Sequence, residues 1–595
     1  MIKTILCTLT AISTFAAHAA TQPNIVFVIT DDQGYGDLSC HGNPVLKTPN
    51  LDKLHAVSLR LTDYHVSPTC TPTRAALMTG RYTNRTGAWH TIMGRSLLRT
   101  NEVTIADYLT KAGYVTGIFG KWHLGDSYPY QPEYRGFQKT YTHGGGGVGQ
   151  TPDVWDNSYF NDTYYEDGEL VKAEGFCTDI FFNEAIEFIE EQHKAKKPFF
   201  AYIATNAPHG PFHAPQKYID MYKDQKGDVA PFFGMIANID DNVGKLRNKL
   251  SEIGAADNTL FIYTTDNGTV RGGKIHNAGM SGGKGKNTEG GHRVPFFMHW
   301  PKKGWTEGRD IPQLTAHIDI LPTVADLCGF EIDGKLPVDG LSLTPLLQKE
   351  QTTNWKDRVI VTDSQRIVNP KKWKDSSTMT QDWRLLNGKK LYQLSKDPGQ
   401  KKNVAKEHPE RVKAMREGYE AWWDSMKDSF SEGAPFHLGN NPKPLSLTAH
   451  DLVGTGGTAS VAWNQGHIRE GKLTGVNEDG AAYWQLKVTK AGKYNFKLSR
   501  YPLSTGLALN ASAPVGEQVP GTSKAFRTIP ARAIDISAGK ILLNGKEIVN
   551  GKADPTKPFM TLTASLPEGT HQLSAVFTTP DGPHTAYFLE VDTSE

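Results

Sequence analysis

The sequence predicts an α/β catalytic region built on an open sheet, followed by a C-terminal β-sandwich. Two observations carry this prediction. Four runs of β-branched and apolar residues, at 23–30, 114–120, 198–204 and 259–265, are typical of strands buried on both faces. Beyond residue 440, apolar residues instead alternate with polar ones over short runs, which is typical of strands with one buried face.

Polar residues follow the first and the fourth of these buried runs. Asp31 and Asp32 follow the first run, and Asp266 and Asn267 follow the fourth. Because the carboxyl ends of parallel strands share one edge of an open sheet, these side chains are expected to converge there. Their oxygens suit Ca²⁺ or Mg²⁺, and Ca²⁺ is favoured when several carboxylates bind directly. Either pair alone is better interpreted as solubilising acids in a turn.

The second and third buried runs lead to cationic or proton-donating residues. Lys121 and His123 follow the second run, and His209 follows the third. Four strand ends of this kind would build one polar site on an apolar sheet. A lone histidine at a strand end is more often a structural residue, so His123 and His209 are candidates only because of their neighbours.

Residues 70–74, CTPTR, precede an apolar helical segment that ends at Gly80. Pro72 suits the first turn of a helix, where its missing N–H has no effect. Cys70 then lies at the positive end of that helix, which favours a thiolate or a bound tetrahedral anion. This points to a modified nucleophile, although the pentapeptide alone leaves open an ordinary buried or disulfide-bonded cysteine.

Over about residues 22–435 the chain resembles the type I sulfatases, the formylglycine-dependent branch of the alkaline phosphatase superfamily. The matching motifs are DDQGYGD at 31–37, TPNLD at 48–52, CTPTR at 70–74, GKWHLG at 120–125, KGKNTEGG at 284–291 and RVP at 293–295. The resemblance implies an alkaline-phosphatase-like fold. In that fold helices flank a large mixed sheet, and a smaller C-terminal antiparallel-sheet subdomain with a long helix follows.

The resemblance also implies a modified residue and a metal. Cys70 would be oxidised to formylglycine (3-oxoalanine) by a formylglycine-generating enzyme, and the hydrated aldehyde would supply the attacking oxygen. Its second hydroxyl allows sulfate to be expelled, whereas a serine would retain a stable sulfate ester. Together with residue 70, Asp31, Asp32, Asp266 and Asn267 would hold one Ca²⁺ that polarises the sulfate oxygens.

The remaining catalytic roles follow from the same resemblance. Arg74 and Lys121 would fix the diol, and Lys121 and Lys284 would neutralise the sulfate oxygens. His209, with Lys284, is the candidate for protonating the departing alcohol. His123 would deprotonate the remaining diol hydroxyl and regenerate the aldehyde.

Composition and the N-terminus agree with an exported enzyme. Residues 1–19 have the pattern of a signal peptide, with Ala17 and Ala19 at its cleavage site. Cys7 lies too near the start to indicate lipid attachment, and no later segment is apolar enough to span a bilayer. We therefore expect the secretion machinery to deliver the protein to the periplasm or the medium, without a membrane anchor. With 65 Lys+Arg against 63 Asp+Glu, no global charge favours nucleic acid.

After removal of the signal peptide four cysteines remain. If Cys70 is modified, Cys40, Cys177 and Cys328 are left, so at most one disulfide is expected and its pairing is not readable from the sequence.

The expected domains are a catalytic domain at 20–345, a C-terminal subdomain at 346–438 and a β-sandwich at 445–595, after a linker at 440–444. Within the sandwich, the alternating runs 484–488 and 494–498 predict a hairpin. The sandwich either binds glycan or has a purely structural role. Nothing in the sequence around Trp463 or Trp484 distinguishes a sugar platform from a core ring.

The glycine-rich segment 143–149 does not follow a strand and open a helix, so we interpret it as a flexible pocket wall rather than a nucleotide-binding loop. Candidates for contacting a sugar are His143, Asp153, Trp155, Arg271 and His276.

The sequence thus predicts a secreted, calcium-dependent sulfatase that removes sulfate from carbohydrates, with exo action on oligosaccharides of a sulfated polysaccharide. A phosphodiester or phosphonate monoester hydrolase of the same superfamily, and a non-catalytic glycan-binding protein, remain alternatives. The sugar, the sulfate position and the oligomeric state are not readable from the sequence.

Overall fold

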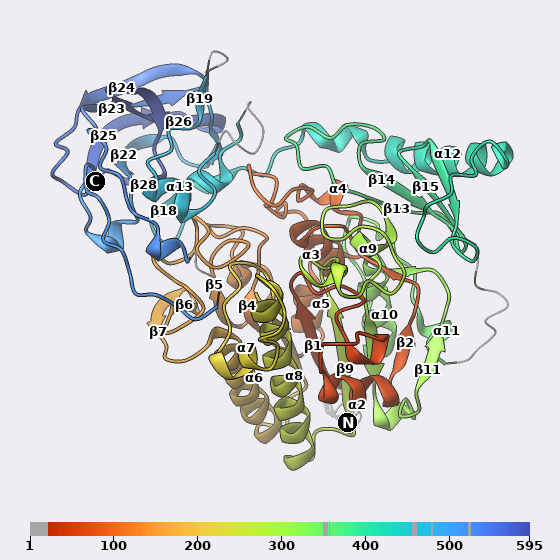
Figure 1. Ribbon diagram of the computed structural model, residues 1–595. Helices are drawn as coiled ribbons and strands as arrows, with labels where there is room; N and C mark the ends of the chain where they lie inside the picture. Colours follow the sequence, from red (N-terminus) through yellow and green to blue (C-terminus); the bar gives the residue numbers. More distant parts are fainter. Residues whose placement is uncertain are drawn as a thin grey trace, which may run out of the picture.

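The structure, a computed structural model, describes residues 22–348, 355, 357–454, 461–477, 480–521 and 525–594. The signal peptide predicted at 1–19 lies outside the described residues. Figure 1 shows a catalytic body, an antiparallel-sheet subdomain and a C-terminal sandwich. Within the described residues, we find no helix whose length and hydropathy would allow it to cross a membrane.

A mixed sheet forms the centre of the catalytic body, with ten strands among the described residues in the order β11-β2-β10-β9-β1-β8-β4-β5-β6-β7. Its five central strands are parallel: β9 (Thr259–Thr265), β1 (Asn24–Thr30), β8 (Phe199–Ala204), β4 (Val115–Lys121) and β5 (Lys139–His143). The outer strands are β10 (Phe296–His299), β2 (Leu59–Leu61), β11 (Arg309–Ile311), β6 (Thr163–Glu166) and β7 (Glu169–Lys172). The four predicted core strands are therefore confirmed, and they lie side by side.

Helices cover both faces of this sheet, which explains why the strands are apolar throughout. Val26 and Val28 of β1 pack into one apolar cluster and Ile25, Phe27 and Ile29 into the other. The first cluster includes α2 (Pro49–Val57), α6 (Cys177–Lys194) and α8 (Val229–Glu252). The second includes α3 (Cys70–Thr79), α5 (Ile105–Lys111) and α10 (Ile320–Cys328).

The shorter elements connect these layers. They are β3 (Tyr64–His65), α4 (Thr83–Thr86), α7 (Gln216–Asp220), α9 (Glu289–His292), β12 (Thr315–Ala316) and α11 (Thr344–Leu347). The four cysteines among the described residues, Cys40, Cys70, Cys177 and Cys328, are all free.

The subdomain is an antiparallel sheet with one long helix, as the sequence predicts. Its strands are β13 (Ile360–Asp363), β14 (Ser376–Met379), β15 (Trp383–Leu386) and β16 (Lys390–Gln393), and its helix is α12 (Pro409–Asp424). The fully buried Arg384 of β15 joins this sheet to the catalytic body. Its guanidinium donates to Asp63 Oδ1 at 3.0 Å and to Glu289 Oε1 at 2.7 Å.

The C-terminal region is a sandwich of two sheets that share an apolar core. One sheet contains β17 (Phe436–Leu438), β21 (Trp484–Val488), β26 (Gly569–Thr579), β23 (Ala538–Leu543), β24 (Lys546–Lys552) and β27 (Gly582–Thr585). The other contains β18 (Leu445–Thr448), β28 (Phe588–Thr593), β22 (Gly492–Ser499) and β25 (Phe559–Leu566). Short additional elements are α13 (Gln465–Arg469), β19 (Val476–Asn477) and β20 (Gly480–Ala481).

Two details of the sandwich differ from the sequence-based expectation. The predicted hairpin is wrong, because β21 pairs with β17 and β26, whereas β22 pairs with β25 and β28. Alternating apolar residues face a shared core equally well from one sheet or from two, so the pattern does not reveal which strands pair. The chain also enters the sandwich before the linker, since residues 436–438, assigned to the subdomain from the sequence, form β17.

The sandwich packs directly on the catalytic body. Its apolar core includes Ile92, Met93, Leu97 and Tyr130, which precede or follow the active-site strand β4 in the sequence. The Met93 N–H donates to the carbonyl of His450 in the sandwich at 2.8 Å.

The buried Arg384 network makes a stability prediction. Burial raises the pKa of Glu289, but the Arg384 guanidinium outweighs it and holds that pKa at about 2. Arg384→Met removes the guanidinium that both Glu289 and Asp63 contact, so we expect a loss of about 3–5 kcal/mol at neutral pH. With the cation gone, burial raises the carboxyl pKa values in the folded state, so the loss should shrink as the pH falls towards 4. Thermal unfolding midpoints between pH 4 and pH 8 measure this difference.

Lys413→Met is the matched control, because Lys413 lies in an exposed pair with Glu417. It should leave the midpoint unchanged at every pH. An Arg384→Met midpoint equal to the wild type would show that the buried network contributes nothing.

Candidate active site

The strand register brings the predicted acidic residues together. Thr30 of β1 lies opposite Thr265 of the parallel strand β9, so Asp31 and Asp266 leave the sheet side by side. Ligand atoms of Asp31, Cys70 and Asp266 all lie within 4.8 Å of one another, and all three residues are buried.

Two buried oxygens in this group have no partner among the described residues. They are Asp31 Oδ1 and Asn267 Oδ1. The amide orientation of Asn267 is fixed, because its Nδ2 donates to Asp32 Oδ1 at 2.8 Å and its oxygen is left free. Burial and the neighbouring Asp266 charge raise the pKa of Asp31 well above its ordinary value. A hard divalent cation would satisfy both oxygens, so this residue set fits such an ion.

Cys70 is the first residue of helix α3, as predicted. Thr69 before it is extended, and the helix ends at Gly80, whose φ is 65° and whose N–H donates to Ala76 O at 2.9 Å. Burial, however, raises the pKa of the Cys70 thiol, which nearby lysines only partly oppose. The thiolate that the helix position alone favours is therefore not stabilised here, and an unmodified thiol at this place is a poor nucleophile.

Arg74 lies one turn further along α3 and contacts both Asp266 and the end of β4. Its Nε and Nη2 donate to Asp266 Oδ2 at 3.0 and 2.9 Å, and its Nη1 donates to the carbonyl of Lys121 at 2.8 Å. Lys121, the last residue of β4, donates its ammonium to Asp31 Oδ2. Both cations are almost completely buried.

Lys284 and His209 lie over Asp32. The Lys284 ammonium is 2.7 Å from Asp32 Oδ1, and the Nε2 of His209 is 3.8 Å from Asp32 Oδ2. His209 Nδ1 donates to the carbonyl of Gly210 at 2.6 Å, so Nε2 is the nitrogen that faces the site. Burial and then the Lys284 charge lower the pKa of His209 to about 3. A bound sulfate carries the opposite charge and acts to raise it.

His123 presents a free lone pair to the site. Its Nε2 donates to the carbonyl of Thr91 at 3.0 Å, and its buried Nδ1 has no partner among the described residues. Burial and the Lys121 charge lower the pKa of His123 well below its ordinary value, so the ring is neutral at neutral pH. A neutral imidazole held in this tautomer accepts a proton at Nδ1.

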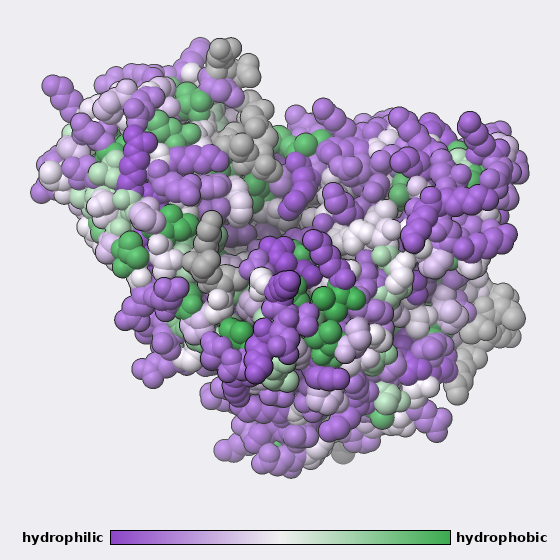
Figure 2. Space-filling model, in the orientation of Figure 1, coloured by the Kyte–Doolittle hydropathy of each residue, from purple (hydrophilic) through white to green (hydrophobic). Residues whose placement is uncertain are grey.

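A pocket of about 210 Å³ opens above these groups. Its lining combines catalytic candidates with residues from all three parts of the chain: Cys70, His90, Thr91, Ile92, His123, Gly146, Gln150, His209, Lys284, Arg366 and Trp463. Figure 2 shows that the molecular surface is hollowed between the C-terminal sandwich and the antiparallel-sheet subdomain.

Comparison with known families agrees with this geometry. The sulfatase family model matches residues 23–330, more than half of the chain, and the model for the C-terminal region of N-sulphoglucosamine sulphohydrolase matches residues 286–420. The chain belongs to the sulfatase family. It is a sulfuric ester hydrolase with the alkaline-phosphatase-like fold that the motifs imply.

Individual relatives of this sulfatase are moderately similar. N-acetylgalactosamine-6-sulfatase of Mus musculus is 32% identical over 382 residues, which cover 58% of this chain and 70% of that protein. Arylsulfatase A of Homo sapiens is 33% identical over 364 residues, which cover 55% and 68%. The crystal structure of Ps i-CgsB matches with a TM-score of 0.62 at 30% identity, covering 68% of this chain and 94% of that one. A structure of Ps i-CgsB in complex with k-i-k-neocarrahexaose matches equally well.

The sulfatase fold places none of the five predicted sugar contacts in the pocket above Cys70. His143 is buried at the end of β5 and donates to its neighbour's carbonyl, at Gly144. Asp153 is also buried and accepts from Gly149 N at 2.8 Å and Asn157 Nδ2 at 3.0 Å, so it shapes its own loop. Trp155 packs against Tyr501 of the sandwich, with ring centroids 5.2 Å apart.

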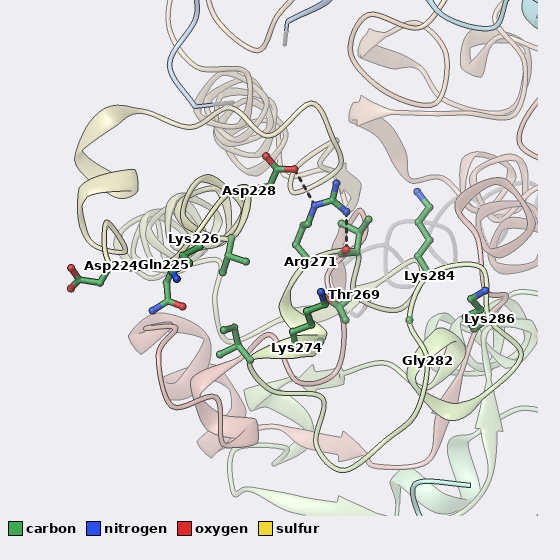
Figure 3. A pocket seen from close by; sticks show the side chains of 15 residues that line it. Asp224, Gln225, Lys226, Asp228, Thr269, Arg271, Lys274, Gly282, Lys284 and Lys286 are labelled. Atoms are coloured by element: carbon green, nitrogen blue, oxygen red, sulfur yellow. Dashed lines mark hydrogen bonds and ion pairs between the residues drawn. The ribbon is translucent and has the colours of Figure 1, made fainter. Parts of the chain in front are cut away.

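The other two predicted contacts lie elsewhere on the surface. Arg271 pairs with Asp228 at 3.2 Å in a separate, wide pocket, which Figure 3 shows and which reaches the active site only at Lys284. His276 Nε2 is 2.9 Å from the carbonyl of His41 and holds the loop after β9.

Six residues that line the pocket have no role assigned from the sequence: His90, Thr91, Ile92, Gln150, Arg366 and Trp463. His90, Gln150 and Arg366 lie in loops without a recognisable motif. Trp463 was considered as a sugar platform or a core ring, and its place in the pocket depends on how the sandwich docks.

The glycine-rich segment contributes a wall of the pocket at Gly146, which yields a prediction. A Cβ on Gly146 would lie 2.0 Å from His123 Cε1 and 2.2 Å from its Nε2. Gly146→Ala should therefore push His123 off Thr91 O and lower turnover of any sulfate ester by about 100-fold, the contribution of one general base. Sulfate release and the thermal midpoint are measured together.

Gly492→Ala is the control, because its Cβ would meet nothing closer than 3.8 Å. Full activity in the Gly146→Ala protein would show that the position of His123 does not limit the reaction.

Proposed function

We propose that this sulfatase is a secreted, calcium-dependent enzyme that removes sulfate from the ends of sulfated oligosaccharides, using a formylglycine made from Cys70. The observation that carries the proposal is the group of unpartnered, buried oxygens beside Cys70, which together with Lys284 lines a small pocket. Such a site combines a metal, an attacking residue and cations for the leaving sulfate.

A carbohydrate substrate is supported by the similar proteins. N-acetylgalactosamine-6-sulfatase is named for a sulfated sugar, and Ps i-CgsB, at 30% identity, has been solved with k-i-k-neocarrahexaose. The pocket volume of about 210 Å³ supports exo action. It lies below the ~300–1,000 Å³ typical of sites for larger ligands, so it suits a single terminal ring rather than the middle of a chain.

The charges of the site suit a sulfate ester. Three buried carboxyl groups face two buried cations and the partly exposed Lys284. Bound Ca²⁺ would add positive charge that polarises the sulfate oxygens and orients the residue at position 70. Lys121 and Lys284 lie where they can stabilise charge that develops on the sulfate group.

The two histidines suit the two proton transfers. His209 Nε2 is the nitrogen that faces the site, and there it can protonate the departing sugar oxygen once sulfate binding has raised its pKa. His123 Nδ1 is free to take the proton of the second hydroxyl at residue 70, which leads to release of sulfate.

Maturation and export complete the proposal. Residues 1–19 act as a signal peptide read by the secretion machinery, a formylglycine-generating enzyme converts Cys70, and the protein works in the periplasm or the medium.

Substitutions at Cys70 test the nucleophile. With the aldehyde confirmed by peptide mass in the wild type, Cys70→Ala should lower sulfate release by at least about 1,000-fold, because no attacking oxygen remains. Cys70→Ser should release no more than one equivalent of alcohol and keep the sulfate as a stable ester. Free sulfate and alcohol are measured separately on defined sulfated oligosaccharides.

Retained turnover in Cys70→Ala would contradict the mechanism. If the aldehyde-bearing wild-type enzyme cleaves phosphodiesters but not sulfate esters, the phosphodiester or phosphonate monoester alternative is favoured instead.

Calcium binding is tested by stability rather than activity. Ca²⁺ at 100 times its dissociation constant should stabilise the metal-free wild type by about 2.7 kcal/mol and raise its thermal midpoint. Asn267→Leu removes a ligand oxygen and should lose most of this shift.

Asp310→Asn, which alters an exposed carboxylate, should keep the calcium shift. An equal calcium shift in Asn267→Leu, or none in the wild type, would remove the calcium assignment while leaving the nucleophile in place.

A further inference from the structure

The C-terminal sandwich reaches the active site. Trp463 lines the same pocket as Cys70 and His123, although it lies far along the chain in a different domain. The two family matches end at residues 330 and 420, so this wall lies outside the part of the chain that they cover.

The segment that carries Trp463 is fixed to the catalytic body. The carbonyl of Trp463 accepts from Thr151 N at 3.0 Å, and the Gln465 N–H donates to Gly149 O at 3.0 Å. The buried Gln465 amide also donates to the carbonyl of Asp153 at 3.2 Å. Residues 149–153, part of which was expected to touch sugar, therefore hold the sandwich segment against the pocket.

The two tryptophans considered from the sequence have different surroundings. Trp484 is fully buried and donates to the carbonyl of Thr448 at 2.8 Å, so it is a core ring. Trp463 is only partly buried, and its ring is held edge-on by His467 with centroids 5.4 Å apart. It offers an aromatic surface in a pocket whose other large side chains are mostly charged or polar. Sites that orient small polar ligands combine these two kinds of group.

His90 adds a buried polar group to the pocket. It is 1% exposed, lines the pocket, and its Nε2 has no partner among the described residues. Its Nδ1 accepts from Thr91 N at 2.6 Å, which places the proton of the neutral ring on Nε2. A buried N–H of this kind needs an acceptor, which a sugar hydroxyl supplies.

We propose that the sandwich completes the substrate site, with Trp463 as the platform against which the apolar face of the sulfated sugar packs, and the His90 Nε2–H as a donor to one of its hydroxyls. This inference rests on the proposed carbohydrate substrate. It assigns a specificity role to the C-terminal domain.

The test separates binding from turnover. The dissociation constant of a defined sulfated oligosaccharide is measured by calorimetry on full-length Cys70→Ala protein, alone and combined with Trp463→Ala or Trp463→Phe. Loss of the platform should weaken binding by about 10- to 100-fold, whereas the phenylalanine variant, which keeps an aromatic face, should recover most of it. Val515→Ala, an exposed apolar change in the sandwich, should bind like its parent.

Turnover and sulfate affinity supply the second readout. In enzyme that carries the aldehyde, Trp463→Ala should raise KM for the oligosaccharide with little change in kcat, and the inhibition constant of inorganic sulfate should stay at the wild-type value. Unchanged oligosaccharide affinity would overturn the inference. Equal weakening of inorganic sulfate would also overturn it, because the substitution would then have disturbed the catalytic centre.

Failure of the proposed function gives a different result. If oligosaccharide binds through Trp463 but no sulfate is released by the aldehyde-bearing wild type, the platform stands and the sulfatase proposal for that substrate fails. If no sulfated oligosaccharide binds to Cys70→Ala at all, the platform is overturned.

Discussion

The pairing of three buried carboxyl groups with three cations, two of them buried and the third partly exposed, is the constraint on which the rest of the active site depends. Arg74, Lys121 and Lys284 each contact one of the acids Asp266, Asp31 and Asp32. Unpaired, any of these charges would carry a desolvation penalty of several kcal/mol. The pairs come from the ends of β1, β4 and β9, from helix α3 and from the loop before α9, so the acids and cations fix these elements against one another. A divalent cation bound here would add positive charge, which favours the binding of an anionic ester.

The same charged groups affect the ionisation of the Cys70 thiol. Cys70 lies among paired charges and beside the unpartnered oxygens of Asp31 and Asn267, and its burial opposes ionisation. A thiolate would add a fourth negative charge to the set, whereas a neutral hydrated aldehyde adds hydroxyl groups that can donate and accept hydrogen bonds. The geometry therefore suits the proposed formylglycine at position 70 better than a cysteine thiolate.

Much of this centre was readable from the sequence, because its parts are local. Asp31, Lys121 and Asp266 lie at or directly after the ends of buried strands and Cys70 starts a helix, and the apolar runs together with Gly80 located those elements. Lys284 lies in a loop and was a candidate only through the family resemblance. Pairing between distant strands is harder to predict from the sequence. The alternation at 484–488 and 494–498 predicted two strands correctly but wrongly paired them with each other. The same side chains are buried whether the two strands pair or lie in opposite sheets. The five predicted sugar contacts failed to reach the pocket for a related reason. The composition of a loop does not reveal which other loops lie next to it in the folded protein.

The position of Trp463 illustrates which interactions decide how the loops are arranged around the pocket. Its segment gives no signal by itself, and its position follows from the docking of the sandwich on Ile92 and Met93 and from the hydrogen bonds of Gln465. The groups that carry out the reaction need a rigid arrangement. Most of them lie near strand ends, where changes in sequence are poorly tolerated. Substrate selection needs only one surface of suitable shape near the reacting ester, and an appended domain can supply that surface without altering a single catalytic contact. With Trp463 in the proposed role, a change in the sandwich would alter which sugar is accepted while the charge pairs of the active site remain as they are.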